Sequence, residues 1–299
     1  MKTLFDELKR EHVFNVAPKR VVSLVPSDTL TLADLGVGST LVGRTDYCEL
    51  PEAIVSGVPS VGGTKNPNLD AICDLSPDLV LANKEENTKA DLEKLVKRGV
   101  RVFIAFPCTV SQGIAHLARL ARAFHVEKDP AARDLVKRGY EMVREAEEAR
   151  KLRVPLRAFC PIWMDPLMTV NQETYIGDAL DLCGAINVFA ERQRRYPLAA
   201  DLGKAKPLPP ERLVGRDTRY PRVTLEEVAE RSPELVILPD EPHPFSDEDA
   251  KVFLAQDTPA ARAKAVVRTG GKDVCWYGSR AVEGIPRLRA VIDRYRPLS

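Results

Sequence analysis

Short apolar runs that stop at turn residues alternate along the chain with stretches of helical period. Residues 20–25, 78–82 and 100–105 are three such runs, rich in valine, leucine and isoleucine, and they predict buried strands. Residues 89–98 repeat their apolar positions at helical spacing, and Gly99 follows as the predicted helix C-cap. Strands that alternate with helices predict a parallel sheet with crossover helices, so we expect an α/β fold.

One helix–turn–strand unit occurs in both halves of the chain. Residues 69–82 read LDAICDLSPDLVLA, and residues 225–238 read LEEVAERSPELVIL. In each copy the proline disfavours the helical conformation of the serine before it, and the apolar run that follows suits a strand covered on both faces. Thr224 and Glu227 match a capping box that begins the second helix. Because each copy lies well inside its own half, we predict two similar, Rossmann-like lobes.

A long helix is predicted between the two copies. Residues 127–152 are rich in Ala, Glu, Arg and Lys, and a helix of about 22–25 residues would span about 33–38 Å. Its central position favours a strut that joins two lobes, with an ordinary surface helix as the alternative. We therefore divide the chain into an N-terminal α/β lobe (1–126), a linking helix (127–153) and a C-terminal α/β lobe (154–299).

The second half repeats the alternation of strands and helices. Residues 156–160, 235–238 and 274–277 are predicted strands, and residues 175–183 a helix. Residues 191–222 are polar and rich in proline, arginine and lysine, which predicts a long loop over the second lobe, where function often resides.

The charge balance gives no reason to expect a nucleic acid or a membrane surface as a partner. The 299 residues carry 44 basic and 43 acidic side chains, a formal net charge of +1. No run of about 18 apolar residues predicts a membrane span. The first 12 residues also lack the uninterrupted apolar stretch of about 7–15 residues that a secretory signal needs. We therefore expect a cytoplasmic location for the chain as it stands, and a periplasmic or extracytoplasmic one if a signal peptide precedes it.

Candidate binding residues follow the predicted strands, because ligands of open α/β sheets bind beyond the carboxyl ends of the strands. Ser27 or Asp28 can cap the helix that begins there or face an anion. Both tryptophans of the chain lie at strand ends, where aromatic side chains suit a large flat ligand, although core packing is an equal alternative. The predicted binding set is Ser27, Tyr47, Gly62, Gly63, Thr64, Asn83, Glu86, Phe106, Trp163, Met164, Tyr220, Glu241, His243, Trp276, Tyr277 and Gly278.

Catalytic and metal motifs are weak. There is no G-x-S-x-G sequence, and the six cysteines form no C-x-x-C pair, which predicts mostly buried free thiols. The four histidines lie far apart, and His116 and His125 are interpreted as helix-face residues. We therefore predict no catalytic residue and no resident metal. His243, at a strand end, is the candidate ligand for a metal centre that a bound molecule would carry.

Several segments resemble the cobalamin-binding branch of the helical-backbone (class III) solute-binding proteins. The segments are RVVSLVPS (20–27), LVGRTDYC (41–48), VGGTKNPNLDAI (61–72), SPDLVLANKEEN (76–87) and WYGSRAVEGIPRL (276–288), and the resemblance runs from about residue 18 to residue 295. It implies two Rossmann-like lobes joined by one long helix. It also implies receipt of a corrinoid, haem or iron-siderophore and delivery to the permease of an ABC importer.

The resemblance also carries residue roles. It implies a cleft between the lobes lined by Tyr47, Gly62, Gly63, Asn83, Trp163, Tyr220 and the segment 276–278. Asn83 departs from the family, which has an aromatic residue there. Glu226 is similar to the glutamate that docks the importer, whereas Lys89 stands at the first-lobe counterpart, where Glu85 or Glu86 can substitute.

The predicted function is therefore non-catalytic binding of cobalamin or a similar metal chelate, as the solute-binding component of an importer and with no cofactor of its own. One alternative is a cytoplasmic carrier or sensor of such ligands that does not dock an importer. The other is a cleft enzyme that uses Glu86, Glu241 and His243 as acid–base groups.

Overall fold

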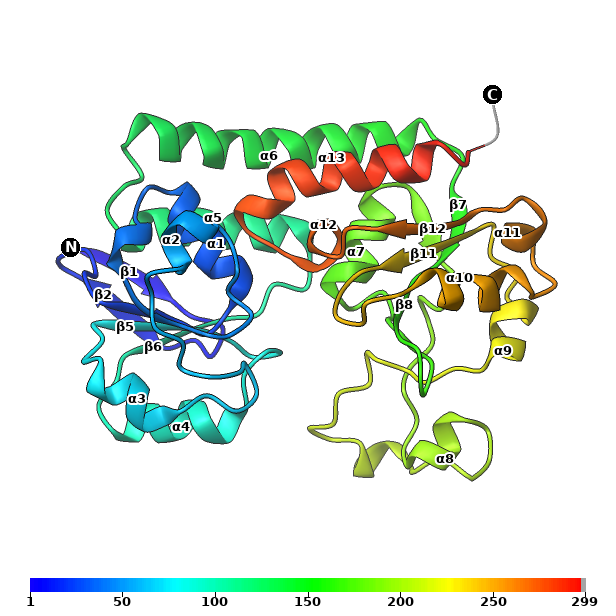
Figure 1. Cartoon of the computed structure of the whole chain (residues 1–299), viewed down its shortest axis with the longest axis horizontal. Helices are drawn as coiled ribbons and strands as arrows, with labels where there is room; N and C mark the ends of the chain where they lie inside the picture. The colour runs from blue at the N-terminus through cyan, green and yellow to red at the C-terminus, as the bar shows by residue number, and fades with distance from the viewer. Residues whose placement is uncertain (297–299) are drawn as a thin grey trace. The chain divides into compact units, whose positions relative to one another are not determined.

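The computed structural model of the chain describes residues 1–296 and divides into two compact units (Figure 1). The first unit comprises Met1–Pro107, Ser111–Glu141 and Trp276–Val282. The second unit comprises Cys108–Val110, Met142–Cys275 and the residues from Glu283 onward. None of the helices in the described part combines the length and hydrophobicity needed to cross a bilayer.

The first unit is built on a parallel sheet of four strands in the order β4-β3-β5-β6. The strands are β3 (Val21–Ser23), β4 (Leu41–Arg44), β5 (Leu79–Asn83) and β6 (Val102–Ala105). All five residues of β5 and all four of β6 are buried, as expected for strands covered on both faces. A hairpin of β1 (Lys2–Phe5) and β2 (Glu11–Phe14) lies outside this sheet. The helices are α1 (Pro26–Asp34), α2 (Glu52–Val55), α3 (Leu69–Asp74), α4 (Lys89–Lys97) and α5 (Val110–Ala123), with the 3-10 turn η1 (Gly38–Thr40).

The second unit has its own parallel sheet, in the order β10-β7-β11-β12. Its strands are β7 (Leu156–Phe159), β10 (Ala185–Asn187), β11 (Leu235–Pro239) and β12 (Val266–Thr269), beside an antiparallel hairpin of β8 (Pro161–Trp163) and β9 (Met168–Thr169). The helices are α7 (Tyr175–Leu182), α8 (Leu198–Asp201), α9 (Leu225–Glu230), α10 (Asp247–Leu254), α11 (Pro259–Arg262) and α12 (Lys272–Cys275), with the 3-10 turn η2 (Pro210–Arg212). The predicted α/β class with two parallel sheets is confirmed.

Helices α6 (Pro130–Lys151) and α13 (Ser279–Asp293) each contribute several residues to both units. The predicted long helix is confirmed as α6, 22 residues long, and the division between the units falls within it, after Glu141. Helix α13 likewise begins in the first unit and continues in the second. The segment Trp276–Val282 packs with the first unit, although we assigned it to the C-terminal lobe; the predicted lobe boundaries otherwise stay a prediction.

The repeated sequence folds into the same local structure twice. Helices α3 and α9 have six residues each, and the strands β5 and β11 have five, all of them buried. Between helix and strand, Ser76 has a φ of 45° and Ser232 a φ of 48°. Each serine therefore leaves the right-handed helical region immediately before its proline, which ends the helix as predicted.

The contacts that hold the two copies in place also repeat. Arg20 Nη2 donates to the Leu75 carbonyl over 2.6 Å, and Arg157 Nη2 donates to the Arg231 carbonyl over 2.5 Å. The residue after each proline accepts from the backbone N–H of the same arginine: Asp78 from Arg20 and Glu234 from Arg157, both over 2.9 Å. The two units thus share tertiary interactions that their short sequence match only partly reveals.

Two local predictions in the second unit are wrong. Residues 274–277 are not a strand: Val274 belongs to α12, a helical turn whose backbone N–H groups bond back to Gly271. The fourth strand is instead β12, which is only half-buried and therefore has a weak apolar pattern. The capping box of α9 is half formed, because Thr224 accepts from the Glu227 N–H while the Glu227 carboxylate accepts from Arg192 over 3.0 Å.

Candidate functional site

The sheet of the first unit gathers its predicted site residues at one edge, because all four parallel strands end there. Ser27 follows β3, Tyr47 follows β4, Asn83 ends β5 and Phe106 follows β6. Phe106 is half-buried, and the ammonium group of Lys84 lies 4.8 Å from the centroid of its ring. This edge therefore combines aromatic, amide and charged groups.

Tyr277 joins two of these chain segments, those of Ser27 and Asn83, through its hydroxyl group. Asn83 Nδ2 donates to the Tyr277 oxygen over 3.1 Å, and the Ser27 side chain is also hydrogen-bonded to it. The ring packs edge-on against His116, with 5.6 Å between ring centroids. Burial, and after it the nearby charge of Asp28, raises the pKa of Tyr277 well above its ordinary value of 10.0. Three predicted site residues are thus brought together around a neutral phenol.

The amide of Asn83 is already engaged within the unit. The side-chain Oδ1 of Asn83 accepts from the backbone N–H groups of Glu85 (2.6 Å) and Glu86 (3.3 Å). The backbone N–H of Asn83 donates to Asn87 Oδ1 (2.9 Å). Asn87 in turn donates to the carbonyl of Thr64 over 2.9 Å. Asn83 therefore positions the turn that carries Glu86. Asn87 was not among our candidates, and the only signal for it is the polar run that follows a buried strand.

Helix α1 begins differently from our prediction. Its N-cap is Val25, without a side-chain cap, so neither Ser27 nor Asp28 caps it. Asp28 instead lies fully buried against His116, with 2.9 Å between Oδ1 and Nε2. Pro26 in the first turn explains the difference, because its fixed φ suits the helix start without a capping side chain. His116 is thus a paired core residue.

The glycine loop and Tyr47 lie next to each other. Gly62 has a φ of 94°, a conformation that favours glycine. A Cβ at Gly63 would lie 2.4 Å from Asn66 Oδ1 and 3.7 Å from Tyr47 Cε2, so the loop backbone packs beside the tyrosine ring. Tyr47 is 61% exposed, which leaves its ring accessible to a ligand.

Gly278 fixes the return of the chain to the first unit. Its φ is 75°, and a Cβ there would lie 2.4 Å from Thr31 Oγ1. The same Oγ1 accepts from the Ser279 N–H over 3.2 Å. The close approach requires glycine, and it holds the neighbouring Trp276, which is 8% exposed, and Tyr277 in place.

In the second unit, two predicted residues from different strand ends meet. The rings of Trp163, at the end of β8, and His243, after β11, lie edge-on with 5.3 Å between centroids. His243 also contacts Phe245 (4.6 Å between centroids), and its Nε2 lies 3.8 Å from Asp249 Oδ2. Trp163 is 44% exposed, and its indole N–H donates to the Asp165 carbonyl over 2.9 Å. The tryptophan ring is therefore both oriented and accessible.

Tyr220 lies beside the hairpin that carries Trp163 and Met164. The Thr169 N–H in β9 donates to the Pro221 carbonyl over 3.0 Å, which brings the two segments together. Tyr220 and Met164 are both half-buried. Both residues therefore lie on segments next to the strand that ends at Trp163.

Glu241 is engaged with its neighbours. Its Oε2 lies 3.4 Å from the ammonium of Lys272, and the Cys275 thiol donates to its Oε1 over 3.4 Å. Gly271 lies so close that a Cβ there would be 2.5 Å from Glu241 Cγ. Within residues 1–296, no three His, Cys, Asp or Glu side chains converge as a metal site would require.

The two positions compared with importer-docking residues both lie at helix starts. Glu226 is exposed in the first turn of α9, where hydrogen bonds from its own backbone N–H and from the Thr224 hydroxyl lower the pKa of its carboxyl. Lys89 is exposed in the first turn of α4, 3.7 Å from Glu93. The two units therefore present opposite charges at these positions.

Known proteins match both the sequence and the fold. A vitamin B12-binding protein of Photorhabdus laumondii is 27% identical over 258 residues, which covers 85% of this chain and 81% of the relative. A vitamin B12-binding protein of Yersinia pestis is 29% identical over 182 residues, which covers 60% of this chain and 64% of the relative.

Two solved structures share the fold at low sequence identity. The periplasmic vitamin B12 binding protein of Vibrio cholerae has a TM-score of 0.72 at 18% identity and covers 94% of this chain and 98% of its own. A periplasmic heme-binding protein from Roseiflexus sp. RS-1 has a TM-score of 0.73 at 17% identity and covers 93% and 98%. A family model described as "Periplasmic binding protein" matches residues 21–272. The chain therefore belongs to the periplasmic binding protein family.

Proposed function

We propose that this solute-binding protein takes a corrinoid of the cobalamin type, or a related metal chelate, and binds it without chemistry. Two relatives of this chain are named for vitamin B12, which supports a corrinoid as the first candidate ligand. One of the solved structures with the same fold is named for heme, which makes haem the second candidate.

The observation that carries this proposal is the pair of accessible aromatic rings at strand ends. Tyr47 and Trp163 are 61% and 44% exposed, although large aromatic side chains are among those that gain most from burial. The Trp163 ring is oriented by the bond of its indole N–H to the Asp165 carbonyl, and the Tyr47 ring lies beside the Gly63 backbone. Preorganised flat surfaces suit a corrin or porphyrin ring, because little side-chain entropy is lost on binding.

The remaining predicted residues take two kinds of role in this proposal. Asn83, Ser27 and Tyr277 act as positioning residues, because their polar groups already bond to one another. His243 is the candidate axial ligand to the metal of the chelate, because its ring contacts Trp163 and histidine is a common ligand of such metals.

A binding role explains the carboxylate Glu241 better than an enzymatic one. Lys272 and Cys275 already contact it, so it is poorly placed to serve as a free acid or base. Membership of a solute-binding family points the same way. We therefore place the acid–base use of Glu86, Glu241 and His243 behind ligand binding.

Delivery to an ABC importer is part of the same proposal, with Glu226 as the docking residue of the second unit. Its exposed carboxylate is available to an arginine of a permease. Lys89 would repel such an arginine, so docking at the first unit would use Glu85 or Glu86. The relatives of known structure are described as periplasmic, which favours a location outside the cytoplasm.

The test is a calorimetric titration of the purified chain with cyanocobalamin, cobinamide and haem, followed in parallel by the visible spectrum of each ligand. The proposal predicts one site of micromolar or tighter affinity for a corrinoid. A spectral change that His243→Ala removes would place His243 on the metal. Binding of haem alone would change the ligand, and binding of none of the three would contradict the proposal.

A further inference from the structure

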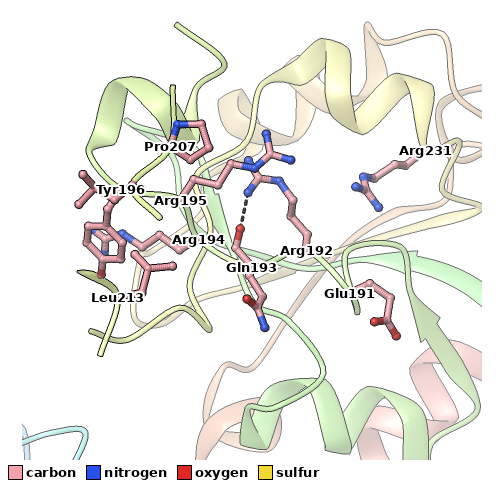
Figure 2. A pocket seen from close by; sticks show the side chains of 10 residues that line it. Glu191, Arg192, Gln193, Arg194, Arg195, Tyr196, Pro207, Leu213 and Arg231 are labelled. Atoms are coloured by element: carbon pink, nitrogen blue, oxygen red, sulfur yellow. Dashed lines mark hydrogen bonds between the residues drawn. The ribbon is translucent and has the colours of Figure 1, made fainter. Parts of the chain in front are cut away.

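The polar segment that follows β10 forms a pocket lined by arginines in the second unit (Figure 2). The pocket has a volume of about 380 Å³ and is lined by Glu191, Arg192, Gln193, Arg194, Arg195, Tyr196, Pro207, Leu208, Leu213 and Arg231. Figure 2 shows Arg192, Arg194 and Arg195 on one side and Arg231 on the other. Four of the ten lining residues are therefore cationic, against one carboxylate, Glu191.

Two carboxylates outside the pocket lining are ion-paired with its arginines: Asp201 with Arg192, and Glu227 with both Arg192 and Arg231. Arg192 is buried and donates to Asp201 Oδ1 and Glu227 Oε1, both over 3.0 Å. Asp201 also accepts from the backbone N–H groups of Arg195 (2.8 Å) and Arg222 (2.8 Å). The Arg192 ion pairs therefore build the wall of the pocket and leave little negative charge for the other arginines.

Arg231 lies 3.4 Å from Glu227, whereas Arg194 and Arg222 form no ion pair within the described residues. Arg194 and Arg216 stack on Tyr196, 4.6 Å and 4.9 Å from its ring centroid. Arg222, next to the pocket, has its Nε and Nη1 buried without a hydrogen-bond acceptor among the described residues. Burial first, and the charge of Arg194 second, lower the pKa of Arg222. The Nε atoms of Arg194 and Arg231 are also buried without an acceptor.

Clustered cations that are partly removed from water raise the free energy of the folded chain, and an anion between them lowers it again. The planar guanidinium group presents N–H donors in a fork that matches the oxygens of a phosphate. We propose that this pocket binds a compact multivalent oxyanion of the phosphate or pyrophosphate class, with Arg194 and Arg195 as its principal contacts. The test of this site uses no corrinoid, so its result does not depend on the corrinoid proposal.

The first experiment is a calorimetric titration of the full chain with inorganic pyrophosphate at low salt, with thermal unfolding as a second readout. One saturable site and a rise in Tm with pyrophosphate concentration are expected, and added sodium chloride should weaken binding. Absence of saturable binding up to millimolar pyrophosphate would overturn the proposal, as would binding only to vesicles that contain phosphatidic acid.

Variants then locate the site. Arg195→Gln and Arg194→Gln should each weaken pyrophosphate binding by about tenfold or more, because each removes charge-assisted hydrogen bonds. Arg262→Gln is the matched control: it makes the same charge change at an exposed arginine of the same unit whose partner is Asp257, and affinity should be unchanged. An equal loss of affinity in all three variants would mean that only the net charge of the chain matters, which would contradict a specific anion site.

Arg222→Met gives a readout that does not depend on measuring affinity. It replaces a charge with buried unpaired donors by an apolar side chain of similar length, so Tm without anion should rise. The gain in Tm from pyrophosphate should become smaller than in the native chain. A fall in Tm without anion, together with an unchanged gain from pyrophosphate, would show that Arg222 is not part of an anion site.

Discussion

Asn83 and Pro239 occupy the same position at the ends of the two repeated strands, but their side chains and backbones form different hydrogen bonds. Asn83 bonds to the Tyr277 hydroxyl and to the turn that follows the strand. Pro239 has no N–H and is followed by Asp240, whose carboxylate accepts from the Gly271 N–H over 2.6 Å. The same helix–turn–strand frame thus ends in a buried polar network in one unit and in a surface turn in the other.

This difference shows which parts of a repeated fold are free to vary. The frame is held by contacts that both copies share, such as the arginine bonds to the carbonyls of Leu75 and Arg231. The exposed aromatic rings lie outside the repeated strands, since Tyr47 follows β4 and Trp163 ends β8. The two units thus share a frame and differ in the side chains around it.

The largest difference in stability is expected between substitutions of Asn83 and Pro239. Asn83→Ala should lower the free energy of unfolding by about 3 kcal/mol, because it removes the side-chain acceptor of the Glu85 and Glu86 N–H groups and one hydrogen bond of the buried Tyr277 hydroxyl. Pro239→Ala, the matched substitution in the other copy, should cost less than about 1 kcal/mol. Urea unfolding measures both, and equal losses would contradict the distinction between the two strand ends.

A buried thiol in the second unit should make the stability of the chain depend on pH. Burial raises the pKa of Cys160 in the second unit to about 12, from an ordinary value of 9.0. Above pH 9 the unfolded chain releases this proton while the folded chain keeps it, so stability falls by about 1.4 kcal/mol per pH unit for each such thiol. Cys160→Ala should remove one thiol's share of the slope between pH 9 and 11, whereas Cys73→Ala, at a partly exposed thiol, is the control. An unchanged slope in Cys160→Ala would be the contrary result.

Substitutions of Asp78 and Glu234, which hold the two repeated copies in place, should change stability by less. Asp78 accepts from the N–H groups of Lys19 and Arg20, whereas Glu234 accepts from that of Arg157 alone. Asp78→Ala should therefore cost about 1 kcal/mol and Glu234→Ala about 0.5 kcal/mol, both reduced because the bonds are exposed. Thermal unfolding of the two variants tests this order, and a reversed order would show that the copies are held differently.

The smallest effect concerns the two serines. Ser76 and Ser232 have positive φ angles, which cost a side chain about 1–2 kcal/mol but not glycine. Because glycine also loses more entropy on folding, Ser76→Gly and Ser232→Gly should each raise stability by only about 0.5 kcal/mol. The shift in Tm should be the same in both units. A loss of stability in either variant would mean that the serine hydroxyl stabilises the folded chain by more than the positive φ angle costs.

The sequence predicted the frame well because its signals are local. The apolar runs of β5 and β11, the Ser-Pro turns and the helical period of α6 each lie within one continuous stretch. The half-buried β12 gave a weak pattern, and the apolar residues 274–277 read as a strand although Gly271 begins a helical turn there. A periodic pattern reports burial and cannot separate a short helical turn from a strand.

The site was predicted only in part, because its contacts join distant segments. The strand-end rule selected Asn83, Ser27 and Tyr277 but gave no sign that they bond to one another. The pair of Asp28 and His116 lies 88 residues apart in sequence and was missed. The arginine pocket was predicted only as a polar loop, because charge imbalance at a site depends on which carboxylates pair with which arginines in the fold.

The central claim is that the exposed rings of Tyr47 and Trp163 are contact surfaces for a corrinoid. The measurement that tests it most directly is calorimetric titration of the native chain, Tyr47→Ala and Trp163→Ala with cyanocobalamin. We expect one site in the native chain and a loss of about tenfold in affinity in each variant, measured at a temperature where both variants are folded. Native binding that neither variant weakens, or no binding in the native chain, would contradict it.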